Sequence, residues 1–132
     1  MCLMGILHIF VNKSGGVISV VRAATPEKAK KVVEEVIAGG VKGIELTFTV
    51  PHADQVIGEL VAKYGDTDAV IGAGTVLDAP TARLAIIAGA QYIVSPAFDA
   101  DTAELCNLYQ IPYLAGCMTI TEITRADRKS VV

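Results

Sequence analysis

One segment of the chain carries a carboxylate where a buried strand is expected to be apolar. Side chains of the segment Gly43–Pro51 alternate between two faces, and Glu45 shares its face with Thr47 and Thr49. A polar face is normal on a solvated antiparallel sheet, whereas a parallel strand is usually covered on both sides. If this strand is parallel, Glu45 faces an enclosed polar interior, where a carboxyl group can do acid–base chemistry.

Further candidate residues lie at the carboxyl ends of the expected strands, where parallel-strand folds place their catalytic groups. Arg22 follows the first expected strand, Thr49 lies at the end of the second with Glu45, and Thr75 follows the third. One cation, one carboxylate and two hydroxyls suit a small anionic, oxygenated substrate. Arg22 would bind its carboxylate or phosphate, and the hydroxyls would orient it.

Each candidate also has a structural alternative. Arg22 could lie on a loop beside a surface partner, Glu45 could form an internal ion pair with Arg22, and Thr75 could cap a turn. The segment Gly72–Gly74 lacks the third glycine of a dinucleotide-binding fingerprint and the Gly-Lys-Ser/Thr of a P-loop. No His, Cys and carboxylate spacing suggests a metal site, so we expect neither a metal nor a cofactor.

The elements that must position these residues alternate between strand and helix from Gly16 onward. This order predicts βαβ units with a parallel sheet, either a (β/α) barrel or a doubly wound sheet. An inward-facing Glu45 favours the barrel. The expected strands are 17–21, 44–49, 69–74, 92–94 and 113–115, and the expected helix starts are Thr25 with Pro26, Asp78, Asp101 with Glu104, and Thr119 with Glu122.

The fold class is therefore α/β, an incomplete (β/α)₈ TIM barrel with about five parallel strands, since a complete barrel needs eight. We expect an N-terminal helix or cover over residues 1–15 and the partial barrel over residues 16–124. Residues 125–132 show no helical apolar stripe and are expected to be an aberrant tail after a truncation.

Composition narrows the possible partners. The 132 residues fit one domain, and 52% of them are hydrophobic but only 5% aromatic, which is typical of buried parallel strands. A net charge of −3 argues against a nucleic-acid partner, and no uncharged segment is long enough to cross a membrane. Cys2, Cys106 and Cys117 lack disulfide or zinc spacing, which fits a reducing cytoplasm.

Five motifs together resemble the 2-keto-3-deoxy-6-phosphogluconate (KDPG) aldolases, a family that also accepts 4-hydroxy-2-oxoglutarate. The likeness covers about residues 16–124 in the same order and spacing. The motifs are Val20–Ala23, Ile44–Pro51, Ile71–Leu77, Ala90–Pro96 and Ile111–Thr119.

The resemblance implies a class I aldolase on a (β/α)₈ barrel, assembled as a homotrimer, that needs no cofactor. Its substrate would be a keto acid or sugar-acid phosphate, cleaved to pyruvate and an aldehyde. Glu45 matches the glutamate that shuttles protons, and Thr75 matches a threonine near the pyruvate carboxylate. Arg22 matches the basic residue near the substrate, and Thr49 matches a second position on the same strand as Glu45.

The chain departs from the family at the sixth strand, which carries the Schiff-base lysine and is absent from the sequence. Lys129 lies in the expected tail and does not inherit that role. Two alternatives to an aldolase fragment therefore stay open: a non-catalytic half-barrel that binds a small keto acid, and one that self-associates through its open edges. A different sugar-phosphate barrel is a further, weaker alternative.

Overall fold

A computed structural model of the chain describes residues 15–130, and within them strand and helix alternate without exception. The expected cover over residues 1–15, apart from Gly15, lies outside the described residues. The elements are β1 (Ile18–Val21), α2 (Pro26–Ala38), β2 (Gly43–Thr47), α3 (Ala53–Tyr64), β3 (Val70–Gly74), α4 (Ala79–Ile87), β4 (Ile93–Ser95), α5 (Ala100–Leu108), β5 (Tyr113–Ala115) and α6 (Ile120–Ser130).

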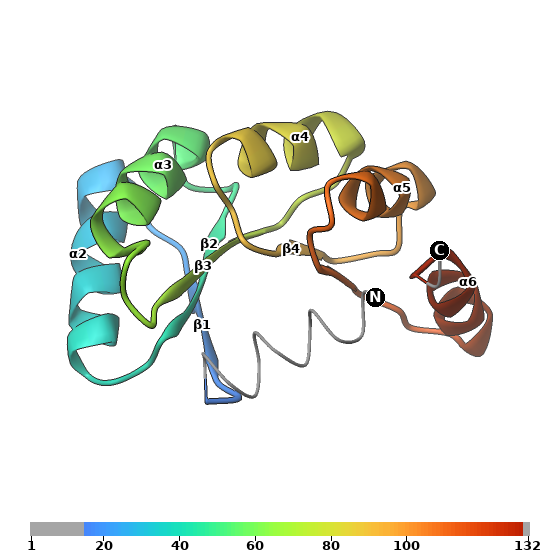
Figure 1. Ribbon diagram of the computed structural model, residues 1–132, viewed down its shortest axis with the longest axis horizontal. Helices are drawn as coiled ribbons and strands as arrows, with labels where there is room; N and C mark the ends of the chain where they lie inside the picture. The colour runs from blue at the N-terminus through green and yellow to red at the C-terminus, as the bar shows by residue number, and fades with distance from the viewer. Residues whose placement is uncertain (1–14, 131–132) are drawn as a thin grey trace.

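The five strands form one parallel sheet in the order β1-β2-β3-β4-β5. Helices α2 to α5 lie along the outer side of this sheet, as Figure 1 shows. Sequential parallel strands with helices on one side are the arrangement of an incomplete (β/α)₈ barrel rather than of a doubly wound sheet, which has helices on both faces. The predicted fold class is therefore confirmed.

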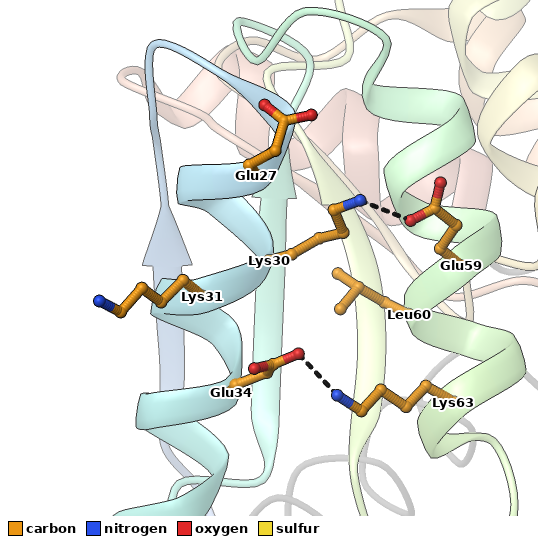
Figure 2. Close-up of a pocket in the computed structure, with 7 residues that line it drawn as sticks. All are labelled: Glu27, Lys30, Lys31, Glu34, Glu59, Leu60 and Lys63. Carbon is orange, nitrogen blue, oxygen red and sulfur yellow. Dashed lines mark hydrogen bonds and ion pairs between the residues drawn. The ribbon is translucent and has the colours of Figure 1, made fainter.

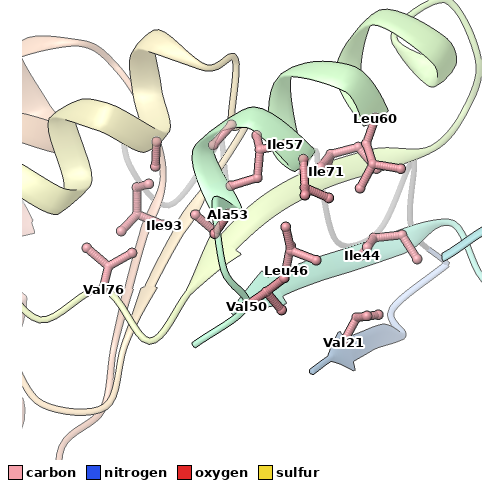
Figure 3. Close-up of a cluster of buried hydrophobic side chains, with 14 of the residues drawn as sticks. Val21, Ile44, Leu46, Val50, Ala53, Ile57, Leu60, Ile71, Val76 and Ile93 are labelled. Atoms are coloured by element: carbon pink, nitrogen blue, oxygen red, sulfur yellow. The ribbon is translucent and has the colours of Figure 1, made fainter. Parts of the chain in front are cut away.

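The main hydrophobic core lies between the sheet and these helices. Ile44 and Leu46 of β2 are fully buried there, against Ile57 and Leu60 of α3 (Figure 3). Glu45 and Thr47 alternate with them and point to the inner face, as the sequence predicted. The strand is shorter than expected, because β2 ends at Thr47.

Side-chain caps begin most of the helices. Thr25 accepts a hydrogen bond from the Lys28 backbone N–H (3.3 Å) at the start of α2, and Asp78 does the same for the Thr81 N–H (2.8 Å) at α4. The predicted start of α5 at Asp101 is wrong. Asp99 is the cap, accepting from the backbone N–H (2.8 Å) and hydroxyl (2.6 Å) of Thr102.

Helix α6 opens at the predicted capping box. The Glu122 carboxylate accepts from the Thr119 backbone N–H (2.9 Å), and the Glu122 N–H donates to the Thr119 hydroxyl (3.2 Å). The helix then continues to Ser130, through residues expected to form an aberrant tail. Arg, Ala and Lys are good helix formers, so a capped segment can stay helical without an apolar stripe.

None of the helices in residues 15–130 is long and apolar enough to cross a membrane.

Candidate active site

Glu45 lies at the inner face of β2, and its carboxylate extends over the neighbouring strand β3. In the strand register Glu45 is opposite Gly72, and Thr47 is opposite Gly74. A Cβ atom at residue 74 would overlap Oε1 of Glu45, so the carboxylate occupies the space that a side chain at Gly74 would fill. Gly74 is the last residue of β3, which places the carboxylate at the carboxyl end of the barrel.

Partial burial raises the pKa of the Glu45 carboxyl above its ordinary value, because the charged form loses contact with water. The positive charge of Arg22 acts in the opposite direction and is the smaller effect. In the described part of the chain, Arg22 and Glu45 are not within the 4.0 Å of an ion pair, and Arg22 is exposed. The alternative of an internal ion pair is therefore wrong.

A chain of hydroxyls connects the ends of β1 and β2. The Thr47 hydroxyl is fully buried and donates to the backbone carbonyl of Val21 (3.3 Å). Since Thr47 has only one hydroxyl proton, Thr49 is the donor in the bond between the two hydroxyls (2.7 Å). Thr49 thereby lies at the same barrel end as Arg22, which directly follows Val21 in the chain.

Thr75 has a backbone conformation that a β-branched residue seldom adopts, with φ of 57° in the left-handed region. Such strain clusters at ligand-binding and catalytic sites, where the surrounding structure enforces it. Within residues 15–130 the Thr75 hydroxyl has no hydrogen-bond partner, and Asp78 caps the helix that follows. The capping alternative for Thr75 is therefore not supported, and its hydroxyl is available to a ligand.

The four candidates thus lie toward one end of the sheet. Arg22, Thr49 and Thr75 follow β1, β2 and β3, and the Glu45 carboxylate extends from the middle of β2 to Gly74 at the end of β3. The sequence missed two features of this arrangement. Gly74 was interpreted only as the last residue of an expected strand, although it accommodates Glu45. Tyr92 was interpreted as an ordinary strand residue, although its fully buried ring lies on the inner face next to Gly72.

A surface groove of about 400 Å³ between α2 and α3 is a different feature, located on the helical side of the sheet (Figure 2). Two ion pairs cross it, Lys30–Glu59 (2.8 Å) and Lys63–Glu34 (2.6 Å). Its lining holds three lysines and three glutamates, so it offers no net charge to select a ligand. Because solvent screens exposed pairs of this kind, they add little to stability.

Within residues 15–130, no three His, Cys, Asp or Glu side chains come together in a group that could hold a metal ion.

Comparison with known proteins identifies the family of the chain. Residues 9–128 match the family model described as KDPG and KHG aldolase. The chain belongs to this family. It is 36% identical over 110 residues to the 2-dehydro-3-deoxy-phosphogluconate aldolase of Treponema pallidum (strain Nichols), covering 83% of this chain and 51% of that protein. It is 34% identical to the 2-dehydro-3-deoxy-6-phosphogalactonate aldolase of Escherichia coli (strain K12), covering 80% and 51%.

A solved aldolase has the same arrangement of elements. The crystal structure of KDPG aldolase from Legionella pneumophila, with pyruvate captured as a covalent carbinolamine intermediate, superposes with a TM-score of 0.81 at 26% identity. The match covers 92% of this chain and 57% of that one. The chain therefore spans about half the length of the family members that it matches.

The lysines whose side chains are described lie away from the candidate site of this aldolase-family chain. Lys28, Lys30 and Lys31 are on α2, and Lys63 is on α3. Lys42 directly precedes β2, at the opposite end from the carboxyl ends, and is paired with Asp68 (2.6 Å). None of these amines is at the carboxyl end of a strand.

The raised pKa of Glu45 has a consequence for stability. The folded state holds its proton to a higher pH than the unfolded state, so the folded state loses stability as the pH rises from the ordinary value of 4.5 through the folded pKa. We expect Glu45→Gln to lose less stability than wild type between about pH 4 and about pH 7. Urea unfolding at both pH values would measure the change in the free energy of unfolding for each protein, with Glu59→Gln as the exposed control. Equal losses in wild type and Glu45→Gln would contradict the effect.

Proposed function

We propose that this chain supplies the acid–base and carboxylate-binding half of a class I aldolase site. The reaction is cleavage of KDPG, or of 4-hydroxy-2-oxoglutarate, to pyruvate and an aldehyde. The observation that carries this proposal is the Glu45 carboxylate, half-buried over Gly74 at the carboxyl end of the sheet, in a chain of the KDPG and KHG aldolase family.

The chemistry needs one group that both takes and gives a proton near neutral pH. An amine attacks the keto carbon, and loss of water leaves an iminium ion. A base then removes the proton of the substrate hydroxyl, and the carbon–carbon bond breaks as the aldehyde leaves. The electron pair of that bond forms the C=C bond of an enamine, and the electrons of the C=N bond move to nitrogen. The same group returns a proton to the enamine. Partial burial, which raises the pKa of Glu45, suits this carboxyl to both steps.

The remaining candidates would bind and orient the substrate. Arg22 is exposed at the end of β1 and can make charge-assisted hydrogen bonds to an anionic group. The Thr75 hydroxyl, without a partner in residues 15–130, would donate to the pyruvate carboxylate. Thr49, held through Thr47 to β1, would help to orient the substrate beside Glu45.

The attacking amine is proposed to come from beyond strands β1 to β5. The described lysines lie on α2, on α3 or before β2, away from the carboxyl ends. The crystal structure of the Legionella pneumophila protein holds pyruvate as a covalent carbinolamine, which supports attack by an amine as the first step of the proposed reaction. The 132-residue chain would therefore bind pyruvate without cleaving an aldol by itself.

Pyruvate binding to the 132-residue chain tests the proposal. Arg22→Ala is expected to weaken binding by about 10- to 100-fold, because a hydrogen bond to a charged group contributes about 1.5–3 kcal/mol. Arg83→Ala is the matched control, since Arg83 stacks on the Tyr109 ring (4.3 Å) at the helical surface. A titration followed by NMR chemical shifts would measure both. Equal affinities for wild type and Arg22→Ala would contradict a carboxylate-binding role.

A non-catalytic half-barrel is the second candidate, and the position of the described lysines favours it. In that case pyruvate binding would be saturable, and Glu45→Ala would weaken it. Self-association is a related possibility, because Val20, on the open first strand, leaves 53% of its surface exposed. A monomer at every concentration in sedimentation experiments would exclude self-association.

Homotrimer assembly and a cytoplasmic location are the remaining proposals. The outer surface of α4 and α5 exposes Leu84, Ile87 and Leu108, which a subunit contact would cover. Cys106 is buried and Cys117 is half-buried. The spacing of the cysteines fits no disulfide framework, which suits a reducing compartment. The molar mass of the protein isolated from its native source tests the trimer, and its fractionation with soluble metabolic enzymes tests the location.

A further inference from the structure

Tyr92 and Glu45 lie in the same register row of the sheet, and both side chains face the barrel interior. Glu45 is opposite Gly72 in the register of β2 and β3. Ala73 is opposite Ile93 in the register of β3 and β4, so the preceding pair, Gly72 and Tyr92, share the other face. Glu45, Gly72 and Tyr92 therefore form one row across three strands, with a glycine in the middle.

The Tyr92 ring fills the space above the glycine of this row. A Cβ atom at residue 72 would overlap the far end of the ring, at Cζ, Cε1 and Cε2. The hydroxyl reaches beyond β3 and donates to the backbone carbonyl of Ile44 on β2 (2.7 Å). The side chain is fully buried. It starts just before β4, crosses β3 and ends at the backbone of Ile44, the residue before Glu45.

The carboxylate of Glu45, in contrast, reaches one layer further toward the carboxyl end of the sheet. Its carboxylate lies over Gly74, which is two residues beyond Gly72 on the same face of β3. Each glycine receives the side chain of a neighbouring strand: Gly72 receives Tyr92 from one side, and Gly74 receives Glu45 from the other. Burial raises the pKa of Tyr92, and the nearby negative charge of Glu45 raises it further.

We propose that Tyr92 is a positioning residue for Glu45: its ring forms a floor that holds the carboxylate in the layer at the carboxyl end of the barrel. Without the ring, the carboxylate could turn down over Gly72, and water could reach its underside. The catalytic value of this position rests on the proposed aldolase function, but the position itself does not.

Titration of the Glu45 carboxyl by NMR, in the 132-residue chain without substrate, tests the floor. Burial accounts for the raised pKa of Glu45, so Tyr92→Leu is expected to lower it toward the ordinary value. Tyr92→Phe keeps the ring and should leave the pKa of Glu45 unchanged. Tyr113→Leu is the matched control. Tyr113 is also a buried tyrosine, but its hydroxyl accepts a hydrogen bond from the Asp99 N–H (3.1 Å) instead of donating one to β2.

An unchanged Glu45 pKa in Tyr92→Leu would overturn the proposal, as would an equal decrease in Tyr113→Leu. Because no substrate is present, this result is independent of whether the protein is an aldolase. Failure of pyruvate binding with a normal Tyr92 effect would instead count against the proposed function alone.

A double-mutant cycle gives a second test that uses stability. Gly72→Ala should destabilise the wild type, because the new methyl group displaces the ring. The same substitution should cost less in the Tyr92→Leu background, where the space is partly vacant. Urea unfolding of the four proteins would measure the difference. Additive effects, or a Gly72→Ala variant as stable as wild type, would show that the ring does not occupy this space.

Discussion

Replacing Glu45 with glutamine is expected to lower kcat for aldol cleavage by about 10²- to 10⁴-fold, the usual contribution of a positioned acid–base group. The assay uses a longer form of the protein that carries the remaining barrel strands and follows pyruvate release. Glutamine keeps the size of the side chain and its place over Gly74 but cannot exchange a proton. KM should change little, because Arg22 and Thr75, rather than Glu45, are proposed to bind the substrate anion.

Glu59→Gln is the control for this experiment. It removes the same charge from an exposed position on α3, where Glu59 pairs with Lys30. A kcat for Glu45→Gln within a factor of two of this control would contradict the proton-transfer role. A large rise in KM at unchanged kcat would instead assign Glu45 to substrate binding.

Truncation of Leu46 to alanine is expected to have the second large effect, on stability. Leu46 is fully buried between β2 and the helices, and a Leu→Ala change at such a site costs about 2–5 kcal/mol. Small domains are stable by about 5–15 kcal/mol in all, so the loss is a large fraction of the total. Urea or thermal unfolding monitored by circular dichroism would measure it.

Leu84→Ala is the matched control for Leu46, because Leu84 is 52% exposed on α4. It should cost about 1 kcal/mol or less, since about half of its surface stays in contact with water on folding. Equal losses for the two variants would show that β2 does not pack against the helices as described. A wild-type chain without a cooperative transition would show that these five strands need further parts of a barrel to fold.

The alternation of apolar and polar residues and the helix-capping residues predicted the fold well. Alternation in β2 placed Glu45 and Thr47 on the face opposite Ile44 and Leu46, because adjacent residues of a strand point in opposite directions. Capping residues such as Thr25 marked helix starts, because they satisfy the free N–H groups of the first turn. The cap of α5 was misplaced by two residues, since Asp99 and Asp101 both satisfy the sequence pattern and only the chain path selects between them.

The packing inside the barrel could not be predicted in the same way. Whether Gly74 is a turn residue or a space for a carboxylate depends on the register between β2 and β3, which a single sequence does not reveal. The same holds for Gly72 and Tyr92, whose contact joins adjacent strands. The left-handed conformation of Thr75 also had no sequence signal, because glycine or asparagine normally marks such a position.

The most direct test of the proposed half-site is treatment of the 132-residue chain with pyruvate and borohydride, followed by intact-mass and peptide mass spectrometry. Borohydride reduces an imine to a stable amine, so any lysine that forms a Schiff base becomes permanently labelled. We expect saturable pyruvate binding that depends on Arg22, with no labelled lysine. A labelled lysine within this chain would contradict the proposal that the attacking amine comes from elsewhere, and absence of any binding would contradict the half-site itself.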